Sequence, residues 1–448
     1  MSYLDFINQR GQSVEMHGFD PVWMPDCLFD FQLYLVEWSL RKGRSAIFAD
    51  CGLGKSLMEL VWAANVVRQT KGRVLLVTPI AVGLQMLQEA EKFGIDGCSR
   101  SKTGDLASEI IVTNYERLHY FDAKDFSGVV CDESSILKDF KSKTKDAVTA
   151  FIRQVPYRLL ATATAAPNDF HELGTSSEAL GELGYRDMIT KYFKEDQRTH
   201  GSVRQKYRFR EHAKIHFWRW VSSWARACRK PSDIGFSDDR FELPPLHINE
   251  HTVKASRPAD GMLFALPARD FREERAERKA TINERCDKVK DLIAGKDYAV
   301  CWGHGNAECD RMEQVIDGAV QVSGKDSDDN KEAKFEAFQR GDAPYMVIKP
   351  KIGAWGLNWQ HCCYMTTFPS HSYEQYYQSM RRLYRFGQQR PVTVDIVTTE
   401  GEERVLKNLT RKASQADQMF TELTREMQNA TSVELDTFTQ KSEAPPWM

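Results

Sequence analysis

The stretch Ala49-Asp50-Cys51-Gly52-Leu53-Gly54-Lys55-Ser56 decides the fold of this chain. Two apolar residues before it, Ile47 and Phe48, end a run that predicts a buried strand. The apolar pattern of residues 57–67 predicts a helix directly after it. A glycine-rich turn between a strand and a helix is where a phosphate-binding loop belongs, because backbone N–H groups and the helix N-terminus face an anion there.

Each polar or small residue of this loop has a chemical role that suits its type. Gly52 and Gly54 let the backbone turn its N–H groups toward phosphate, Lys55 reaches the outer phosphates, and the Ser56 hydroxyl binds magnesium. Ala49 replaces the usual first glycine of the pattern GxxxxGK[ST], a tolerated variant. An ordinary strand–helix turn is the alternative, and the rest of the chain has to decide.

The composition is that of a folded protein with more than one domain. The chain has 448 residues, of which 42% are hydrophobic and 28% charged, and its formal net charge is -2. Its ten cysteines form no CxxC pair, so zinc and a disulfide framework are not expected. We see no signal peptide or membrane span, and expect a soluble cytoplasmic protein with no membrane partner. A nucleic-acid site would have to be a local basic patch.

Repeated alternation of strands and helices predicts a parallel sheet. Residues 73–79 and 110–115 are two further buried strands, and functional loops of such sheets lie at the carboxyl ends of the strands. Thr78 and Asn114 stand at these ends, where they either bind nucleic-acid phosphates or cap the following helix. Upstream, residues 28–38 predict a helix with Gln32 just inside it. The Gln32 amide suits the edge of an adenine, although a lone glutamine is more often an ordinary surface residue.

Two adjacent acids end another buried strand, at residues 129–135. Burying Asp132 and Glu133 is costly unless a cation or a reactant meets them. Asp132 can hold the magnesium ion that Ser56 contacts, and Glu133 can orient and deprotonate a water molecule. The alternative is a helix N-terminus that carries acids, with Ser134 or Ser135 as its cap.

A further strand ends in small hydroxyl residues, at residues 158–168. Thr162 and Thr164 can hydrogen-bond the acidic pair and sense a γ-phosphate. In isolation the stretch is only a turn of small residues.

In this order the motifs resemble those of superfamily-two helicases, and of Swi/Snf-type DNA translocases in particular. The family's DEAH or DEGH sequence is replaced by Asp132-Glu133-Ser134-Ser135, so the histidine that couples hydrolysis to nucleic-acid binding is absent. Ser135 can replace it through a hydroxyl hydrogen bond. The compact chain and this variant are similar to phage- or prophage-encoded relatives.

A basic and aromatic region follows between Lys191 and Lys230, with twelve basic and three acidic residues. Such a mixture suits a phosphate backbone or exposed bases, and we assign Arg208, Arg210 and Arg219 to DNA binding. Phe217, Trp220 and Trp224 recur at helical spacing, which more often indicates core. We expect a helical insertion over about residues 171–235, apolar inward and basic toward nucleic acid. It resembles the insertion that ends the first lobe in this family, and a boundary follows at residues 243–245.

A second α/β lobe is predicted by strands at residues 298–302, 320–324 and 345–348, after a charged helix at 271–292. Residues 351–358 resemble the family's K-x-G-x-x-G-x-N stretch. This resemblance implies DNA binding by Lys351 and Asn358, and close approach of the nucleotide to Gly356.

Residues 378–388 fit the family pattern QxxxRxxRxGQ. Arg382 and Arg385 are three residues apart, which predicts a shared helical face from which both stabilise charge on the γ-phosphate. The alternative is a basic nucleic-acid face. The resemblance gives Gln378 a coupling role, and Gln388 distinguishes the segment from that of DEAD-box RNA helicases.

The predicted fold is α/β, with two RecA-like lobes at residues 1–245 and 246–430. A helix at 402–429 braces the lobes, and a loose tail covers 431–448. The resemblance implies that ATP with Mg²⁺ is hydrolysed between the lobes to move a monomer along DNA, in duplex form. Two alternatives stay open: a strand-separating DNA or RNA helicase, and an ATP-gated nucleic-acid-binding switch with little motor activity.

Overall fold

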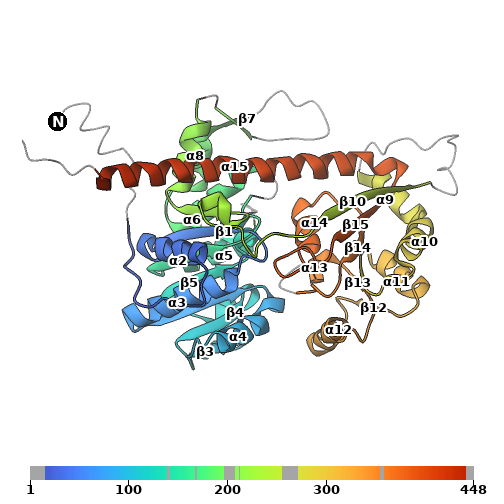
Figure 1. The fold of residues 1–448 in the computed structure, drawn as a ribbon, viewed down its shortest axis with the longest axis horizontal. Helices are drawn as coiled ribbons and strands as arrows, with labels where there is room; N and C mark the ends of the chain where they lie inside the picture. The colour runs from blue at the N-terminus through green and yellow to red at the C-terminus, as the bar shows by residue number, and fades with distance from the viewer. Residues whose placement is uncertain are drawn as a thin grey trace, which may run out of the picture. The chain divides into compact units, whose positions relative to one another are not determined.

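The computed structural model describes residues 16–138, 142–166, 169–195, 207–210, 212–254, 271–353 and 358–439 (Figure 1). The chain divides into two compact units, which are described separately below. The first comprises Met1–Asp238 and Ala416–Met448, and the second comprises Asp239–Gln415. Among the described helices, none combines the length and the apolar character that crossing a bilayer requires.

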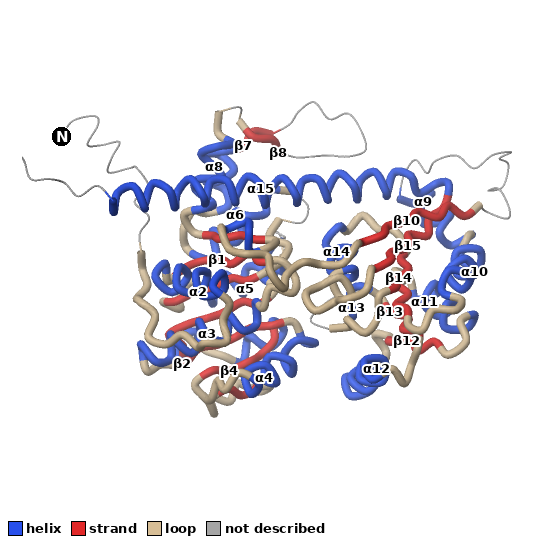
Figure 2. Tube along the Cα trace, in the orientation of Figure 1, coloured by secondary structure: helices blue, strands red, loops and turns tan. Residues whose placement is uncertain are grey.

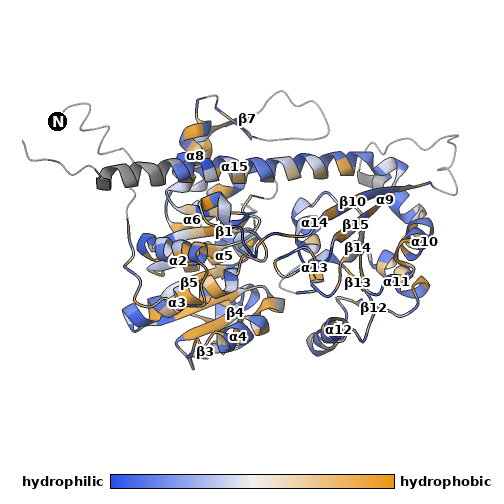
Figure 3. Cartoon of the chain, in the orientation of Figure 1, coloured by the Kyte–Doolittle hydropathy of each residue, from blue (hydrophilic) through white to orange (hydrophobic). Residues whose placement is uncertain are grey.

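A seven-stranded sheet forms the centre of the first unit, in the order β3-β4-β2-β5-β6-β1-β9. Its neighbouring strands all pair in parallel, so their carboxyl ends lie along one edge. The inner strands are hydrophobic runs, as expected for a sheet covered by helices on both faces (Figure 3). The strands are β1 (Arg44–Ala49), β2 (Arg73–Thr78), β3 (Cys98–Arg100), β4 (Ile110–Asn114), β5 (Phe126–Asp132), β6 (Tyr157–Ala161) and β9 (Ala225–Cys228).

Helices connect these strands, as the sequence pattern predicted (Figure 2). The longest of those between the strands is α3, which follows β1 through the glycine-rich loop and buries one residue after another from Leu57 to Val67. The α-helices of this part are α2 (Asp30–Lys42), α3 (Lys55–Thr70), α4 (Gly83–Lys92), α5 (Lys143–Ile152), α6 (Leu173–Leu180), α7 (Tyr185–Tyr192) and α8 (Lys214–Ser222). Short 3-10 helices include η2 (Tyr115–Tyr120) and η4 (Ser134–Lys138).

The basic and aromatic region is more integrated than a protruding insertion. Strands β7 (Phe193–Glu195) and β8 (Tyr207–Phe209) form an antiparallel hairpin beside α8. Phe209 packs on Phe193 and on Phe217 of α8, with ring centroids 4.6 and 5.1 Å apart. Phe217, Trp220 and Trp224 are buried in the core, which confirms the core alternative.

The predicted limits of the insertion, 171–235, are wrong at their end. Strand β9 pairs with β1 and completes the central sheet, because residues 225–228 are all buried and continue the apolar core. Residues 196–206 and 211 of the region lie outside the described part.

The second unit is built on a six-stranded parallel sheet in the order β10-β15-β14-β11-β13-β12. The three strands expected from the sequence are present, and three more complete the sheet. The strands are β10 (Leu246–Val253), β11 (Ala299–Trp302), β12 (Ala319–Val322), β13 (Tyr345–Ile348), β14 (Tyr364–Thr367) and β15 (Val392–Thr399).

Helices on this sheet differ from the prediction at one place. The single charged helix expected at 271–292 is two helices, α9 (Phe271–Ala280) and α10 (Ile282–Ile293), separated at Thr281. The break lets α10 bury Cys286, Val289 and Ile293. The other helices are α11 (Asn306–Val315), α12 (Asp328–Arg340), α13 (Pro350–Gly353), α14 (Tyr373–Met380) and the 3-10 helix η7 (Glu400–Glu402).

The C-terminal helix α15 (Glu403–Thr439) is longer than predicted and is shared between the two units. Its residues from Ala416 onward belong to the first unit, so assigning all of 246–430 to the second lobe is wrong. The reason is that Met419, Phe420 and Leu423 are buried in the first unit's core. The expected tail is helical up to Thr439, because no glycine or proline interrupts residues 403–439. Residues 440–448 lie outside the described part.

Candidate nucleotide-binding site

The glycine-rich loop joins β1 to α3 as the sequence predicted, at the carboxyl edge of the first sheet. Gly52 and Gly54 have φ angles of +90° and +74°, a region that favours glycine. A Cβ atom on Gly54 would lie 2.3 Å from the Gln32 amide nitrogen, so this contact and the positive φ angle both disfavour a side chain there. Both glycines are therefore needed for the shape of this loop.

Gln32 lies against the loop rather than on the surface. It is buried in the first turn of α2, where its Oε1 accepts a hydrogen bond from Phe29 N (3.0 Å). Its Nε2 donates to the carbonyl oxygen of Leu53, 2.9 Å away. The structure thus brings Gln32 to the loop, and its contact with adenine stays a prediction.

The cationic and hydroxyl groups of the loop stand at the start of α3. Lys55 Nζ donates to the carbonyl oxygens of Ala49 and Asp50, at 2.8 and 3.1 Å. Ser56 is half-buried in the first turn of the helix. An ammonium group, a hydroxyl and the N-terminus of α3 lie together here, as phosphate binding requires.

The acidic pair ends β5, two strands from β1 in the sheet. Burial, and the neighbouring Glu133 carboxyl, raise the pKa of Asp132 to about 7 against the opposing effect of Lys55. Glu133 has a φ of +54°, which is uncommon for a residue other than glycine and marks a strained backbone. The buried Tyr115 hydroxyl supports the strand end by donating to the carbonyl oxygen of Asp132, 2.6 Å away.

Two hydroxyl groups hold the Glu133 carboxylate. Thr162 Oγ1, at the end of β6, donates to Glu133 Oε1 at 2.6 Å, and Ser135 Oγ donates to the same oxygen at 3.1 Å. Thr162 Oγ1 also accepts from the backbone N–H of Thr164 at 3.0 Å. The predicted contact between the threonine stretch and the acids is confirmed, as is a hydroxyl hydrogen bond from Ser135. Their coupling role stays a prediction.

The chemistry of these residues fits magnesium and a nucleotide. Within the described ranges, no group of three or more His, Cys, Asp or Glu side chains could hold a metal ion by itself. Mg²⁺ does not need such a cage, because it keeps several waters and takes one or two protein oxygens beside substrate phosphates. Ser56 and Asp132 offer such oxygens, next to a loop suited to the phosphates.

A buried acid that sequence reasoning missed stands beside this pair. Glu59 lies one turn into α3, and burial, with Asp132 as its strongest charged neighbour, raises the pKa of Glu59 well above its usual value. Only its place four residues after Lys55, inside an apolar helix, could have singled it out from the sequence. Tyr115 was also missed, because no local sequence pattern marks it.

In the second unit the predicted arginine fingers follow a helix instead of sharing one. Helix α14 ends at Met380, so Arg382 and Arg385 lie in turns, and the expected shared helical face is wrong. Buried Arg382 is held from within its own segment, since its Nε donates to Gln378 O (3.2 Å) and its NH2 to Gln378 Oε1 (3.1 Å). Arg385 is half-buried. Their finger role stays a prediction.

The side chain of Gln388 stabilises these turns through hydrogen bonds. Its Nε2 donates to the carbonyl oxygens of Gln360, Cys362 and Leu383, and its Oε1 accepts from the two following backbone N–H groups. A buried amide with this many partners has a structural role.

The stretch at 351–358 is described only at its ends. Lys351 is exposed in α13 and Asn358 is half-buried, whereas Gly356 lies outside the described residues. Gly353 is fixed by packing, since a Cβ there would lie 2.4 Å from Ile348 Cδ1.

For Thr78 and Asn114 the structure favours the local alternative over DNA binding. Thr78 is 0% exposed, and its hydroxyl donates to the Pro79 carbonyl oxygen 2.9 Å away. Asn114 caps η2, its Oδ1 accepting from Arg117 N at 3.1 Å. Both side chains are buried and hydrogen-bonded inside the protein, which favours the local role, and DNA binding by Thr78 and Asn114 stays a prediction.

The basic residues of the α8 region divide into two sets. Arg208 and Arg210 are exposed on and after β8. Arg219 is instead paired with Glu426 of α15 (3.1 Å), and Lys214 with Glu422 (2.5 Å). The Arg219 side chain is still 63% exposed, so Glu426 is a competitor for its charge, and DNA binding by Arg219 stays a prediction.

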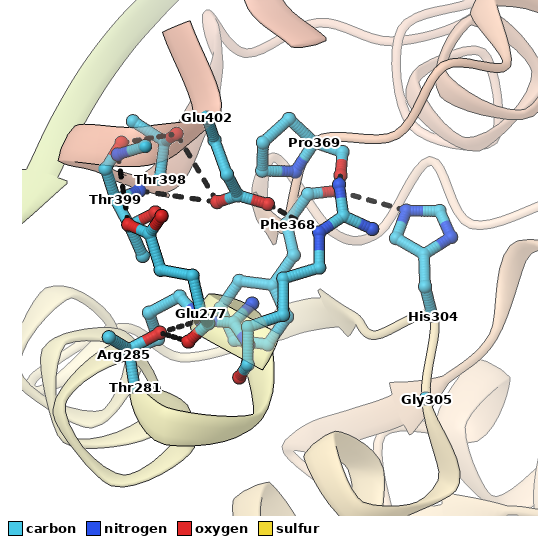
Figure 4. Close-up of polar contacts among 12 residues, drawn as sticks. Glu277, Thr281, Arg285, His304, Gly305, Phe368, Pro369, Thr398, Thr399 and Glu402 are labelled. Carbon is cyan, nitrogen blue, oxygen red and sulfur yellow. Dashed lines mark hydrogen bonds and ion pairs between the residues drawn. The ribbon is translucent and has the colours of Figure 1, made fainter. Parts of the chain in front are cut away.

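A polar network occupies the carboxyl edge of the second sheet (Figure 4). Arg278 of α9 donates to Glu402 Oε1 (2.5 Å) and to the carbonyl oxygen of Pro369 (2.9 Å). His304, after β11, hydrogen-bonds the carbonyl oxygen of Phe368 at 3.0 Å. The network joins the ends of β11, β14 and β15, and no local sequence pattern predicts it because its members are far apart in the chain.

No protein-family model matches the chain, and no curated protein matches it. Solved structures do. The Sulfolobus solfataricus SWI2/SNF2 ATPase core in complex with dsDNA aligns over 91% of this chain and 96% of that chain, with 15% identity and a TM-score of 0.42. S. cerevisiae Dbp5, as a variant bound to Gle1 and IP6, aligns over 86% of each chain, with 10% identity and a TM-score of 0.52.

The likeness to the second of these structures bears on the fold alone. Two successive parallel sheets flanked by helices are the arrangement of two RecA-like lobes. The predicted fold class is therefore confirmed.

Proposed function

We propose that this chain is an ATP-hydrolysing motor that acts on nucleic acid, and specifically that it moves along duplex DNA. The observation that supports hydrolysis best is the arrangement at the first sheet's carboxyl edge. There Lys55 and Ser56 follow a phosphate loop, and Glu133 is held by two hydroxyl groups. The motor and its DNA substrate rest on the ordered motifs of both lobes, which resemble those of Swi/Snf-type translocases.

Each group of the first lobe has a distinct role in this proposal. Gln32 and the loop N–H groups bind the nucleotide, while Lys55 neutralises charge on its outer phosphates. Glu133 orients the attacking water and accepts its proton, and its carboxylate is aimed by Thr162 and Ser135. Ser56 and Asp132 would hold Mg²⁺, which when bound neutralises charge that develops on the phosphates.

From the second lobe, Arg382 and Arg385 are proposed to stabilise the negative charge of the transferring phosphoryl group. Gln378 supports this role for Arg382, since its amide oxygen already orients the guanidinium. Hydrolysis removes that negative charge, and with it a contact that one conformational state makes and the other does not. Losing such a contact shifts the equilibrium between the two states.

The first test is steady-state ATP hydrolysis without nucleic acid and with single-stranded DNA, duplex DNA of increasing length, and duplex RNA. Stimulation by duplex DNA that grows with its length is expected. Preference for single strands or RNA would replace the proposal by a strand-separating helicase, and lack of stimulation would replace it by an ATP-gated switch. Glu133→Gln is the control, expected to bind ATP and lose turnover.

DNA binding by the hairpin region has its own test. Replacing Arg208 and Arg210 by alanine should weaken DNA binding and reduce its salt dependence, because each neutralised phosphate releases a counterion. Arg219→Ala is the matched control. Its guanidinium is paired with Glu426, so the salt slope should change less. If DNA binding by every variant had the same salt dependence as binding by wild type, this face would be excluded from DNA binding.

A further inference from the structure

Glu59 is a buried acid that the mechanism above leaves without a role. Its side chain is 1% exposed, and no donor group within the described part of the chain meets its carboxyl oxygens, which instead contact the carboxyl of Asp132, a second acid. Burying one acid against another is unfavourable, because both are desolvated and like charges repel. An acid at this place therefore needs a reason other than the stability of the fold.

The packing of α3 shows where Glu59 points. A Cβ on Gly128 of β5 would lie 2.9 Å from Val66 Cγ1 and 3.4 Å from the Trp62 ring, so this face of α3 covers β5. Glu59 precedes these two residues by seven and three positions, which places it on the same helix face. Because α3 returns antiparallel to the strands it connects, an earlier position on the helix faces a later position on β5. That later position is the strand end at Asp132.

Electrostatics agrees with this placement. Among charged groups, Asp132 affects Glu59 most and Lys55 next, with Glu133 also contributing. Three of the residues assigned to nucleotide chemistry therefore act on one buried acid, and the Asp132 carboxyl is in hydrogen-bonding contact with it.

We propose that Glu59 is a positioning residue of the magnesium–nucleotide site, acting through Asp132 and through water carried by the metal. This inference rests on the proposed function. Mg²⁺ bound to phosphates keeps several waters, whose protons need acceptors around the ion. The two carboxyl oxygens of Glu59 supply acceptor atoms beside Asp132, where the protein otherwise has apolar helix.

Substitution of Glu59 should affect thermal stability and Mg²⁺-dependent nucleotide binding differently. Glu59→Met fills a similar volume and removes one of two neighbouring buried acids, whose desolvation and mutual repulsion disfavour the folded state. The nucleotide-free variant should therefore unfold at the same temperature as wild type or higher. Its binding of ADP should need at least about tenfold more Mg²⁺, as expected when a partner of the metal's own ligands is lost.

The experiment measures ADP binding by calorimetry over a Mg²⁺ titration, for the full chain, with thermal unfolding as the second readout. Met58→Leu is the matched control, since it changes a buried neighbour in the same turn and should leave the Mg²⁺ dependence unchanged. Glu59→Gln keeps one acceptor oxygen, and its Mg²⁺ requirement should lie between those of wild type and Glu59→Met. It also serves if Glu59→Met fails to fold.

The outcomes are distinct. A wild-type Mg²⁺ dependence in the folded Glu59 variants, with normal ADP binding by wild type, overturns the role of Glu59 alone. Failure of wild type to bind ADP with Mg²⁺ overturns the proposed function and this inference with it. Loss of thermal stability in Glu59→Met without a change in Mg²⁺ dependence would assign Glu59 to the fold.

Discussion

The hydrogen bond from Thr162 to Glu133 offers a direct test of how the acidic pair is aimed. Thr162→Val removes the hydroxyl and keeps the size and branching of the side chain. The lost bond joins Thr162 Oγ1 and Glu133 Oε1 at 2.6 Å, and it links strands β6 and β5 at their carboxyl ends. Because Thr162 is 1% exposed, water does not readily take its place.

The magnitude follows from the kind of bond that is lost. A hydrogen bond to a charged group contributes about 1.5–3 kcal/mol. If that energy is needed to hold Glu133 in the transition state, ATP turnover falls about 10- to 150-fold, since each 1.36 kcal/mol is a factor of ten. The second donor, Ser135, is longer at 3.1 Å, so Ser135→Ala should have a smaller effect.

The assay is steady-state ATP hydrolysis at saturating ATP and DNA, with thermal unfolding to verify the fold. Thr162→Ser is the control because it retains the hydroxyl that donates to Glu133 and accepts from Thr164 N. Both donors bind one oxygen, so the double variant of Thr162 and Ser135 should not show the sum of the single effects. Turnover by Thr162→Val within about twofold of wild type, a change worth under half a kcal/mol, would refute the reasoning.

Three further predictions concern the architecture. Leu423→Ala truncates a buried side chain of α15 within the first unit's core and should lower the free energy of unfolding by about 2–5 kcal/mol in urea titration, whereas exposed Thr421→Ala should have little effect. Equal midpoints would show that α15 is dispensable to that unit. Glu402→Ala leaves Arg278 without its 2.5 Å partner and should cost about 3 kcal/mol, against a negligible change for exposed Glu400→Ala. Burial lowers the pKa of His304; Arg278 and Arg285 lower it further, and Glu308 opposes them. The neutral imidazole therefore contributes stability that is complete above the unfolded pKa of about 6.5 and is lost as the pH falls toward the folded pKa. His304→Gln should therefore flatten the fall in melting temperature between pH 7 and pH 5, and an unchanged slope would contradict this.

Local sequence determined the elements that depend on neighbours in the chain. The phosphate loop needs left-handed glycines and a helix that starts at Lys55, and both requirements are visible within eight residues. The buried strands of both sheets were predictable because parallel strands are short continuous apolar runs. The acids at the end of β5 were evident for the same reason, since a carboxylate pair is conspicuous after an apolar run.

What only the tertiary structure decided involves residues brought together across long stretches of chain. Glu133 and Thr162 are 29 residues apart and meet because β5 and β6 are neighbours in the sheet. Arg219 is indistinguishable from Arg208 in the sequence, and only the fold shows that its guanidinium is paired with Glu426, 207 residues later. Thr78 and Asn114 stood at the predicted strand ends, but packing buried their side chains and directed their hydrogen bonds inward. The chain's local pattern specifies which residues form each element, whereas the pairing of elements specifies which side chains are left to do chemistry. That is why Glu59, which resembles any helical acid in the sequence, is a buried carboxyl in contact with Asp132 in the folded protein.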